Sequence, residues 1–166
     1  MEKTLILLKP DALQRGIVGE IISRFEKVGL KIVGLKMLKP NDQHFFDHYE
    51  AIGKMVSRRG KEAFEVTKEY MQIGPVLAIV LEGIEAVGIV RKMVGTTDPK
   101  VAPPGTIRGD YSHLSMDYAN QKGVSIPNLI HASGDSIEAK LEIKHWFKPE
   151  ELFEYSTVHE KFTLAK

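Results

Sequence analysis

The sequence contains no cysteine among its 166 residues. Disulfide bonds, thiolate nucleophiles, cysteine-ligated zinc and iron–sulfur clusters are therefore excluded. A chain of this length does not need such cross-links, because folding removes roughly 70% of the surface that an unfolded chain of about 150 residues exposes. We expect one domain that spans residues 1–166.

Long apolar runs and an excess of one charge are also missing. The longest apolar stretch, Val76–Leu81, is far shorter than the ~20 residues of a membrane helix, so we expect no membrane span. The first residues lack the features of a secretory signal, which favours a cytoplasmic protein. Twenty-three basic and 22 acidic side chains give a net charge of +1, which argues against nucleic-acid binding.

Hydrophobic periodicity predicts that strands and helices alternate along the chain. The predicted strands cover residues 4–8, 31–39, 76–81 and 126–130. The predicted helices begin at Ile17, between 42 and 70 (two helices), at Ile84 and at Asp135. Residues 96–127 show little periodicity and are interpreted as a long loop with a functional start.

This order of elements indicates an α+β fold. We predict a ferredoxin-like sandwich, in which helices pack on a mainly antiparallel four-stranded sheet, with additional helices and a long loop. The apolar run at residues 4–8 predicts a strand buried on both faces at the centre of that sheet. A doubly wound α/β fold fits the pattern almost as well.

Phosphate-binding residues must be sought outside the common loops, because the chain has no P-loop and no protein-kinase motif. Arg91, Thr97 and Arg108 cluster around the glycine- and proline-rich segment 103–110. The planar fork of arginine meets two phosphate oxygens at once, so this cluster is a candidate phosphate site. Composition alone favours the alternative that these arginines are solvated surface residues.

His131 stands out among the six histidines. It follows a short apolar strand and precedes a turn of small residues, where a side chain is held firmly and yet reached by substrate. An imidazole is a competent nucleophile when a carboxylate orients its second nitrogen, and Glu138 and Glu142 both qualify. His44 and His48 share a helical face but lack a third ligand, so we expect no metal site there.

Several motifs, in the same order along the chain, resemble nucleoside diphosphate kinases. They are Leu8–Asp11, Gly74–Val76, Pro104–Asp110, Asn128–Ser133 and Trp146–Leu152. The resemblance implies that His131 attacks the γ-phosphate of a nucleoside triphosphate and then passes the phosphate to a nucleoside diphosphate by a ping-pong mechanism.

The resemblance also implies roles for other residues and for partners. Arg91, Thr97 and Arg108 would bind the phosphates, and Lys9 and Asn128 would bind the sugar hydroxyls. Lys9 and Tyr49 would also lie near the transferring phosphate. Ser133 and Glu142 would orient the nucleophile. Mg²⁺ would be carried by the nucleotide phosphates rather than by a protein metal site. Other copies of the chain would form a homo-oligomer, a hexamer or a tetramer.

The sequence departs from the family pattern in several places. Where paired phenylalanines are common, the chain has Ala63-Phe64, which makes Phe64 the candidate for contact with the base, with a place in the core as the alternative. Segments 52–61 and 111–125 are longer than usual, and Gly134 separates Ser133 from the following aspartate. Two other functions stay open at this point: a catalytically silent nucleotide-binding regulator on the same fold, and a nucleic-acid-binding protein.

Overall fold

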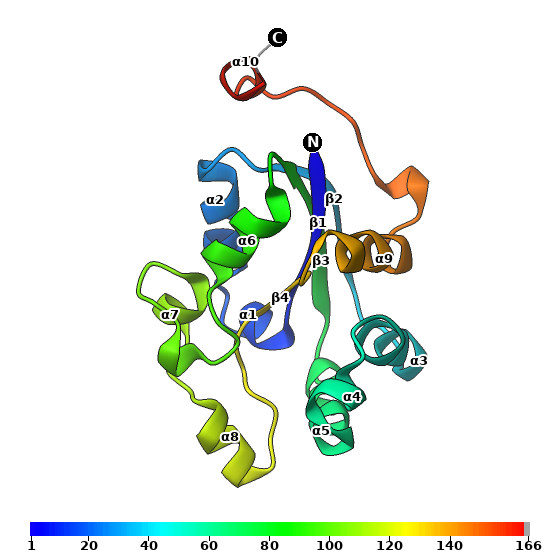
Figure 1. Ribbon diagram of the computed structural model, residues 1–166, viewed down its shortest axis with the longest axis vertical. Helices are drawn as coiled ribbons and strands as arrows, with labels where there is room; N and C mark the ends of the chain where they lie inside the picture. The colour runs from blue at the N-terminus through cyan, green and yellow to red at the C-terminus, as the bar shows by residue number, and fades with distance from the viewer. Residues whose placement is uncertain (165–166) are drawn as a thin grey trace.

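The structure is a computed structural model that describes residues 1–164. Within this range four strands form one antiparallel sheet in the order β2-β3-β1-β4 (Figure 1). The strands are β1 (Glu2–Leu8), β2 (Lys31–Leu38), β3 (Val76–Gly83) and β4 (Ile130–Ala132). The predicted antiparallel α+β sandwich is confirmed, and every strand pair in the described residues is antiparallel.

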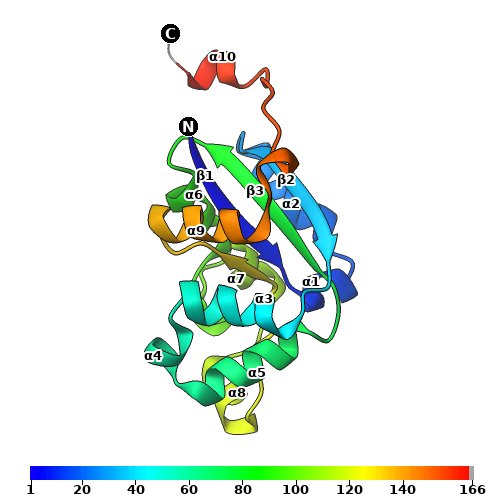
Figure 2. The same cartoon turned by 90° about the vertical axis from the view of Figure 1, so that its right-hand side faces the viewer.

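Helices cover both faces of the sheet, as Figures 1 and 2 show. One face carries α1 (Pro10–Gln14), α2 (Val18–Lys27), α6 (Ala86–Val94) and α7 (Ile107–Tyr111). The other carries α3 (Asp42–Phe46), α5 (Lys61–Met71) and α9 (Ser136–Trp146). The sheet is therefore the middle layer of three.

The central position predicted for the first strand is confirmed. β1 pairs with β3 on one side and with β4 on the other. Its side chains alternate between the two layers, so Ile6 and Leu8 pack under α2 and α6, whereas Leu5 and Leu7 pack under α9. Burial on both faces explains why every position of the run is apolar.

The last strand was predicted at residues 126–130, and this is wrong, because β4 begins only at Ile130. Leu129 has a φ of +71°, a conformation that a leucine rarely adopts and that interrupts an extended strand. The amide of Leu129 donates to the Asp11 carboxylate at 3.0 Å, and its carbonyl accepts from the amide of Lys9 at 2.8 Å. The delayed start places His131 inside the strand rather than after it.

The two segments that were predicted less clearly contain more helix than expected. Residues 42–71 hold α3, a π-helix η1 (Asp47–Ile52), α4 (Met55–Arg59) and α5, instead of two helices. The expected loop at 96–127 holds η2 (Pro99–Val101), α7 and α8 (Met116–Lys122). Short helices of five to seven residues carry too little periodicity to be detected in sequence.

The end of the chain is formed by η3 (Pro149–Glu151) and α10 (Glu160–Thr163). In Figures 1 and 2 this segment extends past the N-terminal end of β1, at the opposite pole from α5 and α8. Among the described helices, none has the length and hydropathy that crossing a bilayer requires.

The packing predicts which substitutions unfold the chain. Ile79 lies in β3 with no exposed surface, inside the layer formed by α2 and α6. We expect Ile79→Ala to lower the free energy of unfolding by about 2–5 kcal/mol, because it leaves a cavity that the neighbouring strands cannot fill. Ile137→Ala, at a side chain that is 71% exposed, should change it by less than about 0.5 kcal/mol. Urea denaturation measures both, and equal losses would contradict the assigned core.

Candidate active site

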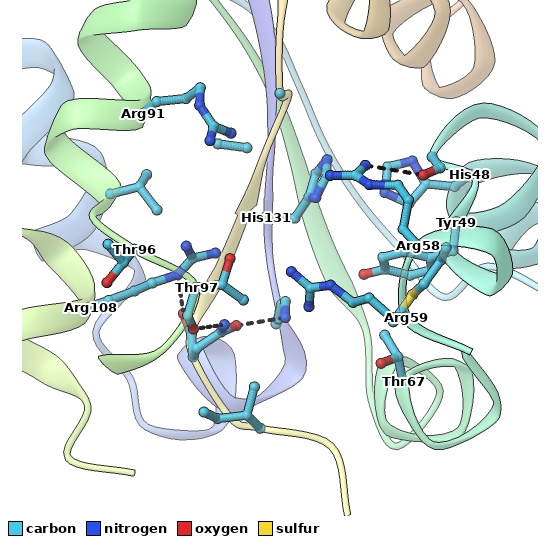
Figure 3. A pocket seen from close by; sticks show the side chains of 18 of the residues that line it. His48, Tyr49, Arg58, Arg59, Thr67, Arg91, Thr96, Thr97, Arg108 and His131 are labelled. Carbon is cyan, nitrogen blue, oxygen red and sulfur yellow. Dashed lines mark hydrogen bonds between the residues drawn. The ribbon is translucent and has the colours of Figure 1, made fainter. Parts of the chain in front are cut away.

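A cavity of about 220 Å³ lies beside β4, between α6 and α7 on one side and η1, α4 and α5 on the other (Figure 3). The end of β1 contributes Lys9 to it, and β4 contributes His131. Because these two strands are paired, with Leu7 opposite His131, the lysine and the histidine are positioned by the sheet itself. The cavity therefore lies against the sheet that forms the middle layer of the fold.

His131 presents one ring nitrogen to the cavity. Its Nε2 lies 2.7 Å from Oε1 of Glu142, close enough for a hydrogen bond that the carboxylate accepts. This contact places the ring proton on Nε2 and leaves the lone pair on Nδ1. The side chain of His131 is 19% exposed, so Nδ1 is held and still accessible. This is the arrangement that a histidine nucleophile requires.

Glu142 is fixed from the other side. The residue has no exposed surface, and its Oε2 accepts a hydrogen bond of 2.6 Å from the Ser133 hydroxyl. The Ser133 oxygen in turn accepts from the amide of Leu5 at 3.2 Å, which ties the carboxylate to the central strand. A buried carboxylate is tolerated only when its oxygens are hydrogen-bonded, and both of these are.

The geometry decides between the two candidate glutamates. Glu142 contacts His131, whereas Glu138 accepts a hydrogen bond of 2.7 Å from the amide of Gly134. Asp135 caps α9 through the amides of Ile137 and Glu138. Gly134 therefore lengthens the turn before α9 while its amide keeps Glu138 at the edge of the cavity.

His48 is a member of the site that sequence reasoning missed. It is 1% exposed, and its Nδ1 accepts a hydrogen bond of 3.1 Å from the indole of Trp146. The same nitrogen lies 3.5 Å from Glu142, and the His48 ring meets the His131 ring edge-on at 4.6 Å. Burial and the neighbouring His131 hold the pKa of His48 well below its ordinary value, so this ring is neutral.

The π-helix η1 explains why two consecutive residues, His48 and Tyr49, both line the cavity. Its wider turn differs from the regular 100° step of an α-helix, and such turns are frequent at functional sites. The Tyr49 hydroxyl is buried without a hydrogen-bond partner in the described residues, and burial raises its pKa. The adjacent His48 and Tyr49 and the single tryptophan, Trp146, were the sequence signals that could have pointed to this part of the site. They were not sufficient, because the sequence does not reveal a π-helix.

Arg108 is held by backbone oxygens. Its guanidinium donates to the carbonyls of Gly95 at 2.9 Å, Ile130 at 2.6 Å and Asn128 at 3.4 Å. Burial, with the nearby charge of Arg91, lowers the pKa of Arg108 to about 10. Arg108 therefore stays charged at neutral pH, and its orientation is set before any ligand arrives.

Lys9 is the most perturbed cation of the site. Its ammonium donates to the Asn128 side chain at 2.7 Å, and the Asn128 amide donates to the Thr97 carbonyl at 2.8 Å. Burial, followed by repulsion from Arg108, lowers the pKa of Lys9 to about 7. A bound anion would attract the ammonium form and so raise that pKa.

Most of the predicted site residues come together. Ser133 lies directly behind the cavity, and the other predicted residues that come together line it. These lining residues are His131, Glu142, Lys9, Tyr49, Arg91, Thr97, Arg108 and Asn128. Phe64 does not reach the cavity, because it is 4% exposed and packs edge-on against Phe46, with ring centres 5.9 Å apart. The lengthened segment instead contributes Met55, Arg58 and Arg59 to the lining, which the sequence did not predict.

The donor atoms of the site do not suit a resident magnesium ion. Within the described residues, one group of three potential ligands is close enough to bind a metal: His48, His131 and Glu142, with atoms within 4.8 Å of one another. His131 and Glu142 already bond to each other, and His48 accepts from Trp146; two of the three ligands are also nitrogens, whereas Mg²⁺ prefers oxygen. His44 does not join them, because its ring stacks on His145 at 3.9 Å.

Comparison with known proteins places the chain among relatives of one kind. The nucleoside diphosphate kinase family model matches residues 2–152. A nucleoside diphosphate kinase from Pyrococcus furiosus is 48% identical over all of this chain and 95% of its own length. One from Borreliella burgdorferi is 43% identical over 93% of this chain and 92% of its own.

Solved structures agree with the sequence matches. A transition-state mimic of the nucleoside-diphosphate kinase from Borrelia burgdorferi, with bound vanadate and ADP, superposes with a TM-score of 0.94 at 42% identity, covering 98% of this chain and 96% of that one. An NDP kinase from Pyrobaculum aerophilum superposes with a TM-score of 0.85 at 43% identity, covering 92% of this chain and 99% of that one.

The lowered pKa of Lys9 predicts a pH dependence of stability. Between about pH 7 and its ordinary value of 10.5, Lys9 is neutral in the folded state and charged in the unfolded state. The unfolded state then binds more protons, so stability rises with pH across this window. We expect the wild type to gain stability relative to Lys9→Met between about pH 7 and pH 9.5 in urea unfolding. A difference that stays constant would contradict the lowered pKa of the buried Lys9.

Proposed function

The chain belongs to the nucleoside diphosphate kinase family, and we propose that it moves the terminal phosphate of a nucleoside triphosphate to a nucleoside diphosphate through a phosphohistidine at His131. The observation that carries this proposal is the hydrogen bond from His131 Nε2 to Glu142, which leaves Nδ1 facing a cavity lined with cations. Transfer of phosphate between nucleotides is the reaction by which the family is named.

The first half of the reaction forms one bond and breaks one. The Nδ1 lone pair attacks the γ-phosphorus, the bond to the β,γ-bridging oxygen breaks, and a nucleoside diphosphate leaves. The ring gains positive charge as the N–P bond forms, and the Glu142 carboxylate stabilises it through Nε2–H. In the second half, a terminal oxygen of another diphosphate attacks the phosphohistidine, and neutral His131 returns.

The cations stabilise the charge that spreads over the transferring group. Arg91 from α6 and Arg108 from α7 line the cavity, with Thr97 beside them (Figure 3), and in this proposal they bind the phosphates. Lys9 contacts the transferring phosphate together with Tyr49, and Lys9 and Asn128 also reach the sugar hydroxyls. Preorganised charges of this kind supply most of the catalysis in phosphoryl transfer.

Magnesium enters with the nucleotide in this proposal. Phosphotransfer between nucleotides generally uses a divalent metal. The two carboxylates that line the cavity, Glu138 and Glu142, are both engaged by hydrogen bonds, so the nucleotide phosphates hold the ion. Assembly into a homo-oligomer, a hexamer or a tetramer, stays a prediction from the family resemblance, and a cytoplasmic location stays a prediction from the first residues of the sequence.

The central experiment is labelling with γ-labelled ATP and Mg²⁺ in the absence of an acceptor. We expect wild-type protein to take up label that is acid-labile, alkali-stable and discharged by GDP, and His131→Ala to take up none, because the proposal assigns the attack on the γ-phosphorus to the His131 imidazole. Nucleotide binding without labelling would instead support a catalytically silent regulator. Binding of nucleic acid with a steep salt dependence would support the other alternative.

A second prediction concerns the orienting carboxylate. Glu142→Gln keeps an oxygen that accepts from Nε2–H but removes the charge that stabilises the phosphorylating ring. We expect kcat to fall about a hundredfold or more, as when a comparable orienting carboxylate is neutralised. Coupled-enzyme kinetics measure the loss, with Glu154→Gln at an exposed position as the control. A loss below about threefold would show that orientation without charge is sufficient.

A further inference from the structure

The chain makes a strained turn at Leu129, two residues before His131. Leu129 has a φ of +71°, and the amide of Ile130 donates to the carbonyl of Asn128 at 2.8 Å. This φ and this hydrogen bond are those of the rare form of γ-turn. A leucine in this conformation costs free energy, so it persists only where the surrounding structure holds it.

The turn decides which side chains reach the cavity. In an extended strand, residues three apart point to opposite faces of the sheet. Asn128 and His131 are three apart, yet both line the cavity. The turn between them brings the two side chains to the same side, so the arrangement of the site depends on the conformation of Leu129.

The carbonyl groups beside the turn also hold a cation. Arg108 donates to the Asn128 carbonyl at 3.4 Å and to the Ile130 carbonyl at 2.6 Å. The Leu129 side chain has no exposed surface and packs in the layer of α2 and α6. A change in the backbone of Leu129 would therefore displace the partners of Arg108 together with His131.

One carboxylate, that of Asp11, is bonded to the turn. Asp11 is buried at the start of α1, and its Oδ2 accepts a hydrogen bond of 3.0 Å from the amide of Leu129. The carbonyl of Leu129 accepts from the amide of Lys9 at 2.8 Å. Both backbone polar groups of the strained residue are therefore held by the segment that follows β1.

The alternative role for Asp11 is that of a counterion for Lys9. Burial, followed by repulsion from Arg108, lowers the pKa of Lys9, and the charge of Asp11 opposes both. The Lys9 ammonium nevertheless donates to Asn128, at 2.7 Å, whereas the Asp11 carboxylate accepts from Leu129. The two roles need different properties of the side chain. A counterion needs the charge, and the turn needs an acceptor atom at the position of Oδ2.

We propose that Asp11 is a positioning residue, which holds the strained turn at Leu129 and so keeps Asn128 and His131 facing the same cavity. Asp11 acts through the backbone and is not one of the residues that line the cavity. The inference rests on the proposed function for the reaction in which this position matters, but the state of the His131 ring can be measured without nucleotide.

Three substitutions separate the turn from the counterion. Asp11→Asn keeps an acceptor oxygen for the Leu129 amide and removes the charge. Asp11→Glu keeps the charge and moves the carboxylate one methylene further along the side chain, and Asp11→Ala removes both. The control is Ile79→Val, which lowers stability in the core of the same layer without contact to Asp11. Urea denaturation measures the folded fraction of each variant.

Two measurements then report on His131. Rapid-quench labelling with saturating γ-labelled ATP and Mg²⁺ gives the rate at which His131 takes up phosphate, and the bound anion keeps Lys9 charged in every variant. Nitrogen-15 spectra of the histidine rings, recorded without nucleotide, show whether His131 carries its proton on Nε2. The second measurement does not depend on phosphate transfer.

We expect Asp11→Ala and Asp11→Glu to slow labelling by about tenfold to a hundredfold, because a small displacement of a reacting group has an effect of this size. In both variants the His131 ring should populate both tautomers, since its contact with Glu142 is displaced. Asp11→Asn and Ile79→Val should label within about threefold of wild type and keep the proton on Nε2.

Three results would overturn the inference. Asp11→Ala that labels at the wild-type rate with an unchanged ring would show that the turn holds itself. Asp11→Asn that loses as much as Asp11→Ala, while Asp11→Glu loses little, would make Asp11 a counterion of Lys9. An equal loss in Ile79→Val would reduce the effect to stability. Wild-type protein that takes up no label contradicts the proposed function instead, and the ring spectra of the variants still decide the role of Asp11.

Discussion

The burial of one carboxylate, Glu142, is the constraint on which the site depends. An unpaired carboxylate in the core costs several kcal/mol, so the fold must supply partners for both oxygens. It does so with Ser133, tied to the central strand, and with the Nε2 of His131. His48 and Trp146 close the space behind Glu142, and the neutral state of His48 avoids a competing cation. The orientation of the nucleophile therefore follows from the stability of the core.

The cations on the opposite wall show the complementary constraint. Arg108 is held by three backbone carbonyls, and Lys9 by Asn128, so neither moves away from its positively charged neighbours. The cost appears in the lowered pKa of both groups. Such preorganised repulsion is retained where a polyanion binds, because the protein then spends no reorganisation energy when the charge arrives.

The sequence predicted the central place of the first strand, the antiparallel sheet and most of the residues that line the cavity, because continuous apolar runs and family motifs are local features. It did not distinguish Glu138 from Glu142 by spacing, and only the path of α9 places the second under His131. It missed His48, whose role depends on a π-helix, and placed β4 too early, because the positive φ of Leu129 is imposed by long-range contacts. Arguments from family position also placed Phe64 at the nucleotide, whereas in this chain the helix turns it into the core.

The central claim is that Glu142 occupies Nε2 of His131 and leaves Nδ1 as the nucleophile. Long-range ¹H–¹⁵N correlation spectra of the protein, phosphorylated with ATP and labelled with ¹⁵N in its histidines, distinguish the two isomers of phosphohistidine directly. The account predicts that the phosphate is on Nδ1 and that Nε2 keeps its proton. Phosphate on Nε2 would contradict it, because the hydrogen bond that orients the ring would then have to break before each transfer.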